Sequence, residues 1–174
     1  MVTVMAALRG TSPQWKTTII VSSALRSHET CRQLRAQPHR IRFSDSIESG
    51  VFVFPLSGTA FLLVGPEDLP EPFEEFQLIE RIKNFLQVHR NCFLLLHDPF
   101  NDKKDVRALL QSRFFGSSLR ILPVHTYPDL VKGMLTIAKA TSKPHVDRIR
   151  DRMSLARARV IETSPKCEML RKML

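Results

Sequence analysis

Leu119–Pro144, with the sequence LRILPVHTYPDLVKGMLTIAKATSKP, is the stretch that decides the fold, because it predicts a strand followed by a helix. The apolar run at its start has the length of a strand, and Pro123 within that run favours an edge strand or a bulged strand. Thr126 is a typical helix N-cap residue, and Asp129 completes a weak capping box. Apolar residues then recur at helical spacing. We expect this helix to end before Pro144, because the residue preceding a proline disfavours helical geometry, and a second helix to start directly after it.

The residues before this stretch predict strands and helices. The predicted strands are Thr18–Ser22, Arg40–Phe43, Val51–Phe54, Ala60–Val64 and Cys92–Leu96. The predicted helices are His28–Ala36, Phe73–His89 and Val106–Phe114. A Ser-Gly turn joins the third and fourth strands into a hairpin, whereas helices separate the later strands and require crossover connections. The fold class is therefore α/β, with a largely parallel sheet that has helices on both sides.

The composition is that of a globular protein with one main domain and a small appendage. Of the 174 residues, 43% are apolar, which is enough to form a core. No apolar run approaches the roughly 20 residues needed to cross a bilayer, and we expect an intracellular protein without membrane contact. The three cysteines, Cys31, Cys92 and Cys167, are widely spaced, which favours buried, unreactive thiols over a disulfide framework or a zinc site.

The positive charge of the chain is concentrated toward its C-terminal end. The formal net charge is +9, from 26 Lys and Arg against 17 Asp and Glu. Residues 130–174 hold 11 basic and 4 acidic side chains, whereas residues 1–129 hold 15 and 13. A basic tail on a nearly neutral domain indicates an acidic partner, and nucleic acid is the first candidate. The alternative is a solvated helical face without a ligand.

The tail after Pro144 combines a narrow apolar seam with many basic residues. The seam residues recur at spacings of three and four, and we predict that they contact a partner chain: Val146, Ile149, Met153, Ala156 and Val160. The predicted DNA-binding residues are Arg148, Arg150, Arg152, Arg157, Arg159 and Lys166. Ser164 and Pro165 predict the start of a last short helix. Two such helices are too small to enclose a core, so the seam needs either another polypeptide or the sheet domain of the same chain.

No arrangement of residues predicts catalysis, a metal site or a cofactor. The six glycines are scattered singly, without a phosphate-binding glycine loop, and the histidines lack metal-ligand spacing with Cys, Asp or Glu. His97 and Asp98 end a predicted strand, which is a favourable place for an active site, but no nucleophile is near them in the sequence. Ser22 and Ser23 follow the first strand, where an ordinary turn is the better interpretation.

One known family shares five stretches with this chain, at 18–23, 43–50, 56–63, 119–125 and 136–144. In these stretches the chain resembles the meiotic sporulation-specific protein sixteen (Spo-sixteen) homologues, which are ERCC-like, non-catalytic members of the XPF/ERCC endonuclease superfamily. The resemblance implies a three-layer α/β/α XPF nuclease-like central domain followed by a small, degenerate helix-hairpin-helix tail. We therefore divide the chain into a flexible leader at 1–16, the central domain at 17–143 and the tail at 144–174.

The same resemblance implies a partner and a cellular role. Members of this family pair with the larger XPF-like meiotic protein known as shortage in chiasmata, and the heterodimer binds branched or single-stranded DNA. The resemblance therefore implies a protein of the nucleus and of meiotic chromosomes. There it would promote crossover formation and synapsis during homologous recombination.

Two departures from the superfamily pattern change what the resemblance implies. Active subunits carry Glu-Arg-Lys and, after three more residues, Asp, whose carboxylates hold the metal that activates water. The corresponding strand here is Phe61–Val64, whose side chains cannot ligate a divalent cation, although Asp45 and Asp68 are nearby in the sequence. In addition, no glycine follows Gly133, so the helix-hairpin-helix motif is degenerate and DNA contact depends on Arg and Lys side chains.

Three functions remain open at this point. We favour a non-catalytic subunit of an XPF/ERCC-like heterodimer that binds branched recombination DNA. The alternative is a pure protein-interaction scaffold, in which the arginines serve solubility and salt bridges without direct DNA contact. An enzyme, such as a small α/β hydrolase or a surviving nuclease, would instead show a cleft with converging carboxylates or a Ser and His pair.

Overall fold

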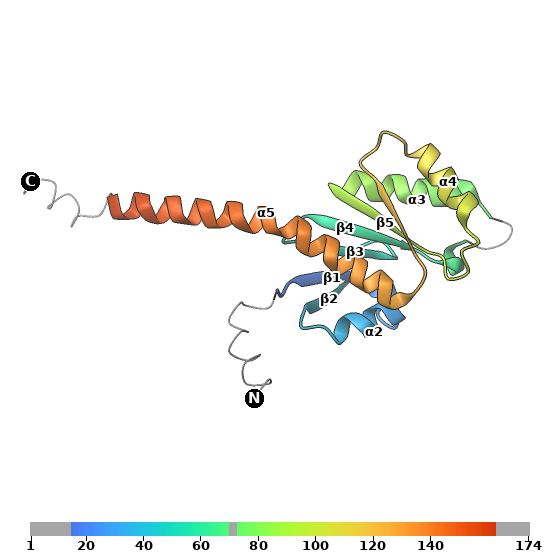
Figure 1. The fold of residues 1–174 in the computed structure, drawn as a ribbon, viewed down its shortest axis with the longest axis horizontal. Coiled ribbons are helices and arrows are strands. Elements are labelled where there is room, and N and C mark those ends of the chain that lie inside the picture. The colour runs from blue at the N-terminus through green and yellow to red at the C-terminus, as the bar shows by residue number, and fades with distance from the viewer. Residues whose placement is uncertain (1–14, 70–72, 163–174) are drawn as a thin grey trace, which may run out of the picture.

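The computed structural model of the chain describes residues 15–69 and 73–162, which form a six-stranded sheet between two layers of helices (Figure 1). The strands are β1 Thr18–Ser22, β2 Arg40–Ser44, β3 Val51–Phe54, β4 Thr59–Val64, β5 Asn91–His97 and β6 Arg120–Val124. Their order across the sheet is β2-β1-β3-β4-β5-β6. Strand β3 is antiparallel to both of its neighbours, and the other three pairings are parallel. The predicted largely parallel sheet is therefore confirmed, as is the hairpin of β3 and β4.

Helices cover both faces of the sheet. They are α2 Glu29–Arg35, α3 Glu75–Val88, α4 Lys104–Arg113 and α5 Tyr127–Glu162, with the short 3-10 turns η1 Ser23–Leu25 and η2 Pro66–Asp68. Apolar residues of α2 and α5 are buried in one core layer, and those of α3 and α4 are buried in the other. The predicted three-layer α/β/α architecture is therefore confirmed. None of the helices in the described part of the chain has the length and hydrophobicity required to span a membrane.

Strand β4 is buried along its whole length. Its alternate side chains enter opposite core layers, with Phe61 and Leu63 on the α2 and α5 side. Leu62 and Val64 enter the layer beneath α3 and α4. Each large apolar side chain buried in this way contributes about 1.5–3 kcal/mol to stability. Burial on both faces explains why the sequence of β4 is an uninterrupted apolar run.

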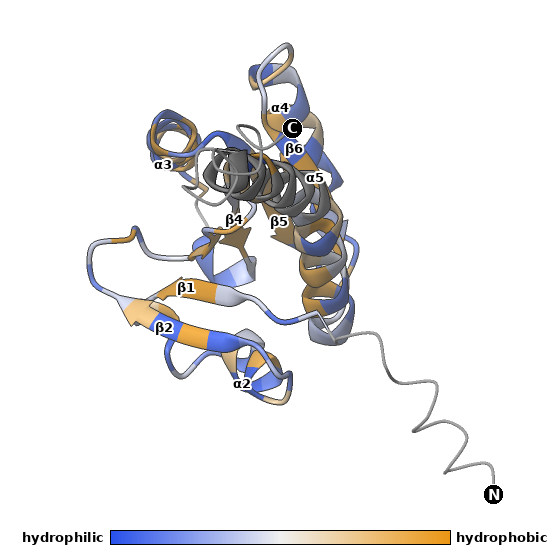
Figure 2. Cartoon of the chain, turned by 90° about the vertical axis from the view of Figure 1, so that its left-hand side faces the viewer, coloured by the Kyte–Doolittle hydropathy of each residue, from blue (hydrophilic) through white to orange (hydrophobic). Residues whose placement is uncertain are grey.

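The two edge strands carry the more polar or irregular residues. Strand β2 alternates between exposed arginines and partly buried apolar residues, which Figure 2 shows as blue and orange bands. Strand β6 forms the opposite edge. Its Pro123 lacks an N–H donor, which an edge strand tolerates because only one side is paired. Both predictions, a half-exposed β2 and an edge position for β6, are confirmed.

The chain enters the sheet through Trp15, whose ring packs edge-on against His39 at a centroid distance of 4.7 Å. The backbone N–H of Thr17 donates to Nδ1 of the same histidine at 3.2 Å. These contacts fix the residues just before β1 onto the domain. Residues 1–14 of the predicted leader lie outside the described residues.

Helix α5 begins with the predicted N-cap. The N–H of Asp129 donates to Oγ1 of Thr126 at 3.2 Å, and the N–H of Leu130 donates to the Thr126 carbonyl at 3.0 Å. The first part of the helix then packs on the sheet. Its buried apolar residues are Leu130, Val131, Met134 and Ala138. The cap and the periodic apolar face together explain why a helix follows β6 directly.

The predicted end of this helix before Pro144 is wrong, because α5 continues through the proline without a break. The hydroxyl of Thr141 donates to the Ile137 carbonyl at 2.8 Å. Similarly, the hydroxyl of Ser142 donates to the Lys139 carbonyl at 2.8 Å. Bonds of this kind bend helices, and a bend relieves the contact between a proline ring and the carbonyl of the preceding turn. Figure 1 shows that α5 changes direction as it leaves the sheet.

Beyond Ser142 the helix extends away from the sheet domain (Figure 1). Ser142 is the last position of α5 described as buried, whereas the following positions with described side chains are exposed: Arg152, Met153, Leu155 and Ala156. Packing therefore changes near the predicted division at residue 143, but the helix itself crosses it, and the division into domains stays a prediction. Residues 144–162 contain no hairpin, and the predicted last helix at Ser164 lies outside the described residues.

Candidate functional site

The family resemblance implies that the metal-binding motif of active nucleases corresponds to the carboxyl end of β4 in this chain. Asp68 follows Val64 after three residues, which is the spacing of the final Asp in the superfamily motif. By this spacing the resemblance implies that Leu62, Leu63 and Val64 correspond to Glu-Arg-Lys of the motif. They are 0%, 3% and 0% exposed. These side chains have no oxygen with which to bind a divalent cation, and they belong to the packed core.

An arginine from α3 occupies the space beside the remaining carboxylate. Nη1 of Arg81 lies 3.2 Å from Oδ1 of Asp68, and Nη2 donates to the Ser49 carbonyl at 2.8 Å. Oδ2 of Asp68 accepts the N–H of Gly65 at 2.9 Å. Gly50, which has a φ of +86°, contributes no Cβ, and a Cβ there would collide with the guanidinium. A fixed positive charge therefore lies beside Asp68, where it repels a metal cation.

The other carboxylates do not complete a metal site in the described part of the chain. Asp45, in the turn after β2, is exposed. Among residues 15–69 and 73–162, no group of three or more His, Cys, Asp or Glu side chains is arranged to hold a metal ion. The site residues at the end of β4 consequently fit a structural ion pair better than a metal centre.

The predicted polar pair His97 and Asp98 has a structural role. Asp98 is 5% exposed, and its carboxylate accepts the backbone N–H groups of Asp102 and Lys103 at 3.0 and 3.1 Å. Burial raises the pKa of Asp98, but these hydrogen bonds outweigh it and hold the pKa below its ordinary value. Its backbone carbonyl also lies 2.8 Å from Nδ1 of His125. Asp98 therefore fixes the loop that leads into α4.

The imidazole of His97 packs against an aromatic ring instead of a nucleophile. Its ring centroid lies 4.5 Å from that of Tyr127, which also contacts His28 at 5.6 Å. Burial lowers the pKa of His97, while the charge of Glu67 partly opposes this shift. Ser22 ends β1 in a buried position and leads into a 3-10 turn, as predicted. No Ser and His pair of hydrolase type is assembled here from the described residues.

The prediction of buried thiols is confirmed for two cysteines. Cys31 and Cys92 are both buried and free. Burial raises the pKa of each thiol from 9.0 to about 11, with the nearby Arg35 charge lowering that of Cys31 slightly. A thiol with such a pKa is almost entirely protonated at neutral pH and therefore unreactive. Cys167 lies outside the described residues.

The predicted partner and DNA surfaces fall on the second half of α5. Met153 of the seam is 54% exposed, and the neighbouring Ala156 is exposed as well. Arg152 of the predicted DNA-binding set is also exposed. The remaining members that lie in α5 are described by their backbone only, namely Val146, Arg148, Ile149, Arg150, Arg157, Arg159 and Val160, whereas Lys166 lies outside the described residues. The assignment of these residues to a partner or to DNA stays a prediction.

The sequence prediction missed one residue of the exposed surface of α5 and one residue at the end of β4. Leu155 is 61% exposed but falls outside the three-and-four spacing that defines the seam. Arg81 is adjacent to the apolar face of α3, and only the tertiary structure brings it to Asp68.

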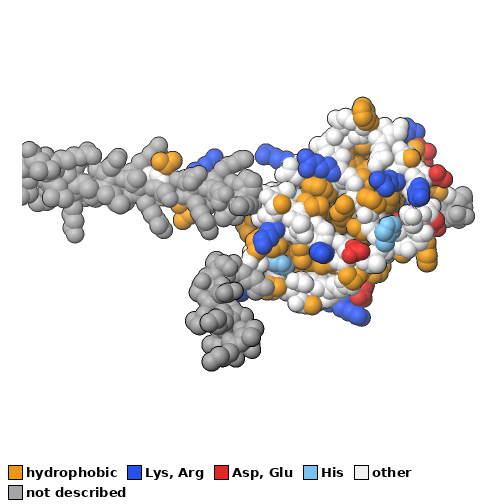
Figure 3. All heavy atoms as spheres, viewed as in Figure 1, with side chains coloured by type: hydrophobic (Ala, Val, Ile, Leu, Met, Phe, Trp, Pro, Cys, Tyr) orange, Lys and Arg blue, Asp and Glu red, His pale blue; other side chains and the backbone are white. Residues whose placement is uncertain are grey.

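Figure 3 shows the charge around the point where α5 leaves the sheet domain. On the face in view, most acidic side chains lie away from this point, whereas several basic side chains lie near it. The basic character of the exit region is therefore not limited to the tail.

Comparison with known proteins decides the family. Residues 13–173 match the family model described as Protein SPO16 homolog. The chain belongs to this family. A human relative, Protein SPO16 homolog, is 42% identical over 161 residues, which cover 91% of this chain and 89% of the relative. The resemblance stated from the sequence is thus confirmed.

Solved structures with a similar fold are XPF proteins from Aeropyrum pernix. The XPF described as a complex with DNA aligns with a TM-score of 0.60 and 10% identity, covering 74% of this chain and 66% of that chain. A second XPF structure aligns with a TM-score of 0.56 and 10% identity, covering 85% and 74%. At this identity the likeness shows the fold alone. The XPF nuclease-like fold of the central domain is therefore confirmed.

Proposed function

We propose that this chain is a non-catalytic subunit of an XPF/ERCC-like heterodimer that binds branched recombination DNA and promotes meiotic crossover formation and synapsis. The observation that carries the non-catalytic part is the end of β4. Buried leucines and a valine stand where the nuclease motif has metal ligands, and Arg81 neutralises the remaining Asp68. A site without ligands cannot generate the metal-bound water that hydrolyses a phosphodiester.

The proposed partner is the larger XPF-like meiotic protein known as shortage in chiasmata. Large apolar side chains on an exposed helix are costly to leave in water, and covering each one contributes about 1.5–3 kcal/mol. Met153 and Leu155 are such residues. We expect the seam of α5 to contribute the main hydrophobic contact, since Met153 is one of its members.

The proposed DNA contact rests on charge. Residues 130–174 hold 11 basic and 4 acidic side chains, and Arg152 is exposed on α5. Contacts between such side chains and phosphates are independent of sequence and sensitive to salt. They suit a protein that acts on branched DNA at many positions along chromosomes, and a nuclear location follows from this role.

The exposed apolar residues also support the alternative of a scaffold without DNA contact. In that case the arginines of α5 would pair with acidic residues of the partner. The two functions differ in one property: only the first predicts that charge reversal of Arg148, Arg152 and Arg157 weakens DNA binding by the heterodimer about equally for all sequences. Unchanged affinity for forked DNA at several salt concentrations would favour the scaffold.

Co-expression of the full-length chain with the XPF-like protein tests the partner surface. We expect Met153→Asp to abolish co-purification, because it places a charge in the seam. The matched control is Thr136→Asp, which puts the same charge at an exposed position of α5 outside the seam. Co-purification that survives Met153→Asp, in a chain whose thermal unfolding is unchanged, would show that the seam does not bind this partner.

A further inference from the structure

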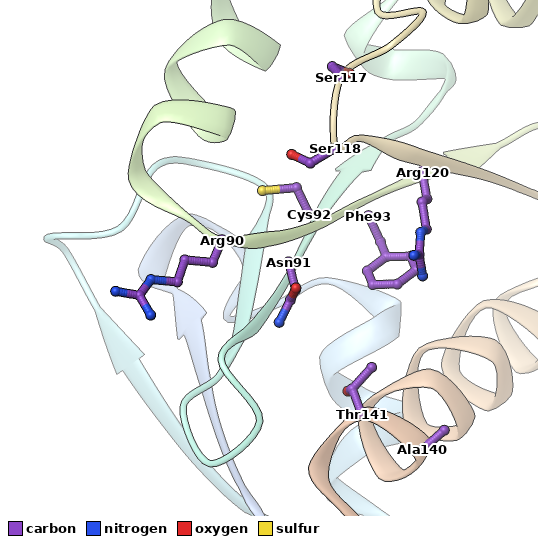
Figure 4. A pocket seen from close by; sticks show the side chains of 9 residues that line it. All are labelled: Arg90, Asn91, Cys92, Phe93, Ser117, Ser118, Arg120, Ala140 and Thr141. Atoms are coloured by element: carbon purple, nitrogen blue, oxygen red, sulfur yellow. The ribbon is translucent and has the colours of Figure 1, made fainter. Parts of the chain in front are cut away.

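A polar hollow of about 530 Å³ lies between the amino ends of β5 and β6 and the helix α5 (Figure 4). Three separate segments line it, with the residues Arg90, Asn91, Cys92, Phe93, Ser117, Ser118, Arg120, Ala140 and Thr141. Among the residues whose side chains are described, the lining contains two arginines and no acidic residue. Because β4, β5 and β6 are parallel, this hollow lies at the opposite end of the strands from Asp68 and Arg81. The hollow is thus distinct from the site of Asp68 and Arg81 at the carboxyl end of β4.

We propose that this hollow binds the phosphodiester backbone of a DNA strand. The inference rests on the proposed DNA-binding function and extends the contact surface from α5 onto the sheet domain. None of the residues predicted from the sequence to bind DNA lies in this hollow, so the two surfaces can be tested separately.

The two arginines supply available positive charge. Both Arg90 and Arg120 are exposed, and neither forms an ion pair with a carboxylate in the described part of the chain. The guanidinium of Arg120 lies over the ring of Phe93, 5.6 Å from its centroid (Figure 4). Stacking of this kind orients a guanidinium while leaving its N–H groups directed outward at the ring edge. Arg120 is therefore held in place without losing its capacity to bind an anion.

The neutral polar groups of the hollow divide into two kinds. The hydroxyls of Ser117 and Thr141 already donate to backbone carbonyls, at 2.6 and 2.8 Å, so they form part of the wall of the hollow without offering a free donor. The side chains of Asn91 and Ser118 make no hydrogen bond with the described residues, and Asn91 lies at the centre of the view in Figure 4. An amide, a hydroxyl and two guanidiniums form a set of donors that suits phosphate oxygens.

The apolar part of the hollow does not suit base recognition. Phe93 is only 7% exposed, and Arg120 covers it. A nucleic-acid base therefore finds no open aromatic face on which to stack, which a site that reads unpaired bases would provide. The hollow consequently favours contact with the backbone of DNA over contact with its bases.

The hollow contacts α5 at Thr141, in the same helix that carries the exposed Arg152 further along. Thr141 and Arg152 lie on the same continuous helix, and eleven residues at about 1.5 Å per residue separate them by about 16 Å. Phosphates of one DNA strand are spaced by about 3.4 Å along a duplex axis, so about five nucleotides span this distance. One bound strand can thus contact both the hollow and the arginines of α5.

Fluorescence anisotropy with the full-length chain tests the proposal, using labelled single-stranded and forked DNA at several salt concentrations. We expect Arg90→Gln combined with Arg120→Gln to weaken binding at least about tenfold at 0.1 M salt. We also expect the slope of log affinity against log salt to fall by about 1.4–1.8, which corresponds to two lost phosphate contacts. The matched control is Arg40→Gln with Arg42→Gln, which removes the same charge from β2 at the opposite edge of the sheet.

The outcomes separate this proposal from the proposed function. If the hollow variant keeps the wild-type slope while charge reversal on α5 removes binding, the hollow is not a DNA site but the chain still binds DNA. An equal loss from the hollow and control variants would also overturn the proposal, since net charge alone would explain it. If the wild-type chain shows no salt-sensitive binding, alone or with its XPF-like partner, both the proposed DNA contact and the hollow are refuted.

Discussion

Replacing Arg81 by alanine should lower the free energy of unfolding by about 1–2 kcal/mol. The side chains of Arg81 and Asp68 are 25% and 28% exposed, and solvent screening limits such a pair to about 1 kcal/mol. Loss of the hydrogen bond to the Ser49 carbonyl adds about 1 kcal/mol. The guanidinium thus links the loop before β3, the turn after β4 and helix α3, and its removal should loosen all three.

Urea unfolding followed by circular dichroism measures this effect, and a double-mutant cycle with Asp68→Asn isolates the ion pair. We expect a coupling energy of about 0.5–1 kcal/mol between the two residues. Arg113→Ala is the control, because its pair with Glu75 at 2.7 Å joins side chains that are 59% and 39% exposed. It should change stability by no more than about 0.5 kcal/mol. An Arg81→Ala variant as stable as Arg113→Ala would refute the structural role assigned to Arg81.

Three further predictions concern buried polar groups. Asp98→Ala should cost about 1–3 kcal/mol in thermal or urea unfolding, because two backbone N–H groups lose their acceptor. Since the pKa of Asp98 is lowered in the folded chain, its contribution to the free energy of unfolding is present above about pH 4 and is lost as the pH falls further. If the difference in unfolding free energy between the wild type and Asp98→Ala were the same at about pH 7 and about pH 2.5, this prediction would be contradicted. The lowered pKa of His97 means that the unfolded chain binds its proton more tightly, so the free energy of unfolding should fall as the pH drops below about 6.5. His97→Asn should reduce this fall between pH 7.5 and 5.5, and an unchanged fall would argue against it. An alkylating reagent at neutral pH should add at most one group to the native chain, because Cys31 and Cys92 are buried with pKa values of about 11. Mass spectrometry counts the added groups, and two or three rapid additions would contradict the burial of these thiols.

Much of the fold follows from local patterns in the sequence. Strand β4 is recognisable as an apolar run, because both of its faces are buried. Pro123 correctly indicates an edge strand, and the Thr126 cap correctly marks the start of α5. These features depend on short-range chemistry, so neighbouring residues are sufficient to predict them.

The features that escaped prediction depend on longer-range structure. The preference of the residue before Pro144 against helical geometry is only a local tendency, and the long helix overrides it. The ion pair of Arg81 with Asp68 joins α3 to the turn after β4, and no periodic pattern signals it. The hollow beside Arg120 is built from three segments that only the sheet topology brings together.

The most direct test of the proposed lack of nuclease activity is an assay for cleavage of forked DNA in Mg²⁺ or Mn²⁺. We expect the purified full-length chain to produce no specific cleavage. With the proposed XPF-like partner present, any cleavage should be unaffected by Asp68→Asn or Asp45→Ala in this chain, because we assign neither carboxylate to a metal site. Specific, metal-dependent cleavage by the purified chain that disappears in either variant would contradict the non-catalytic role.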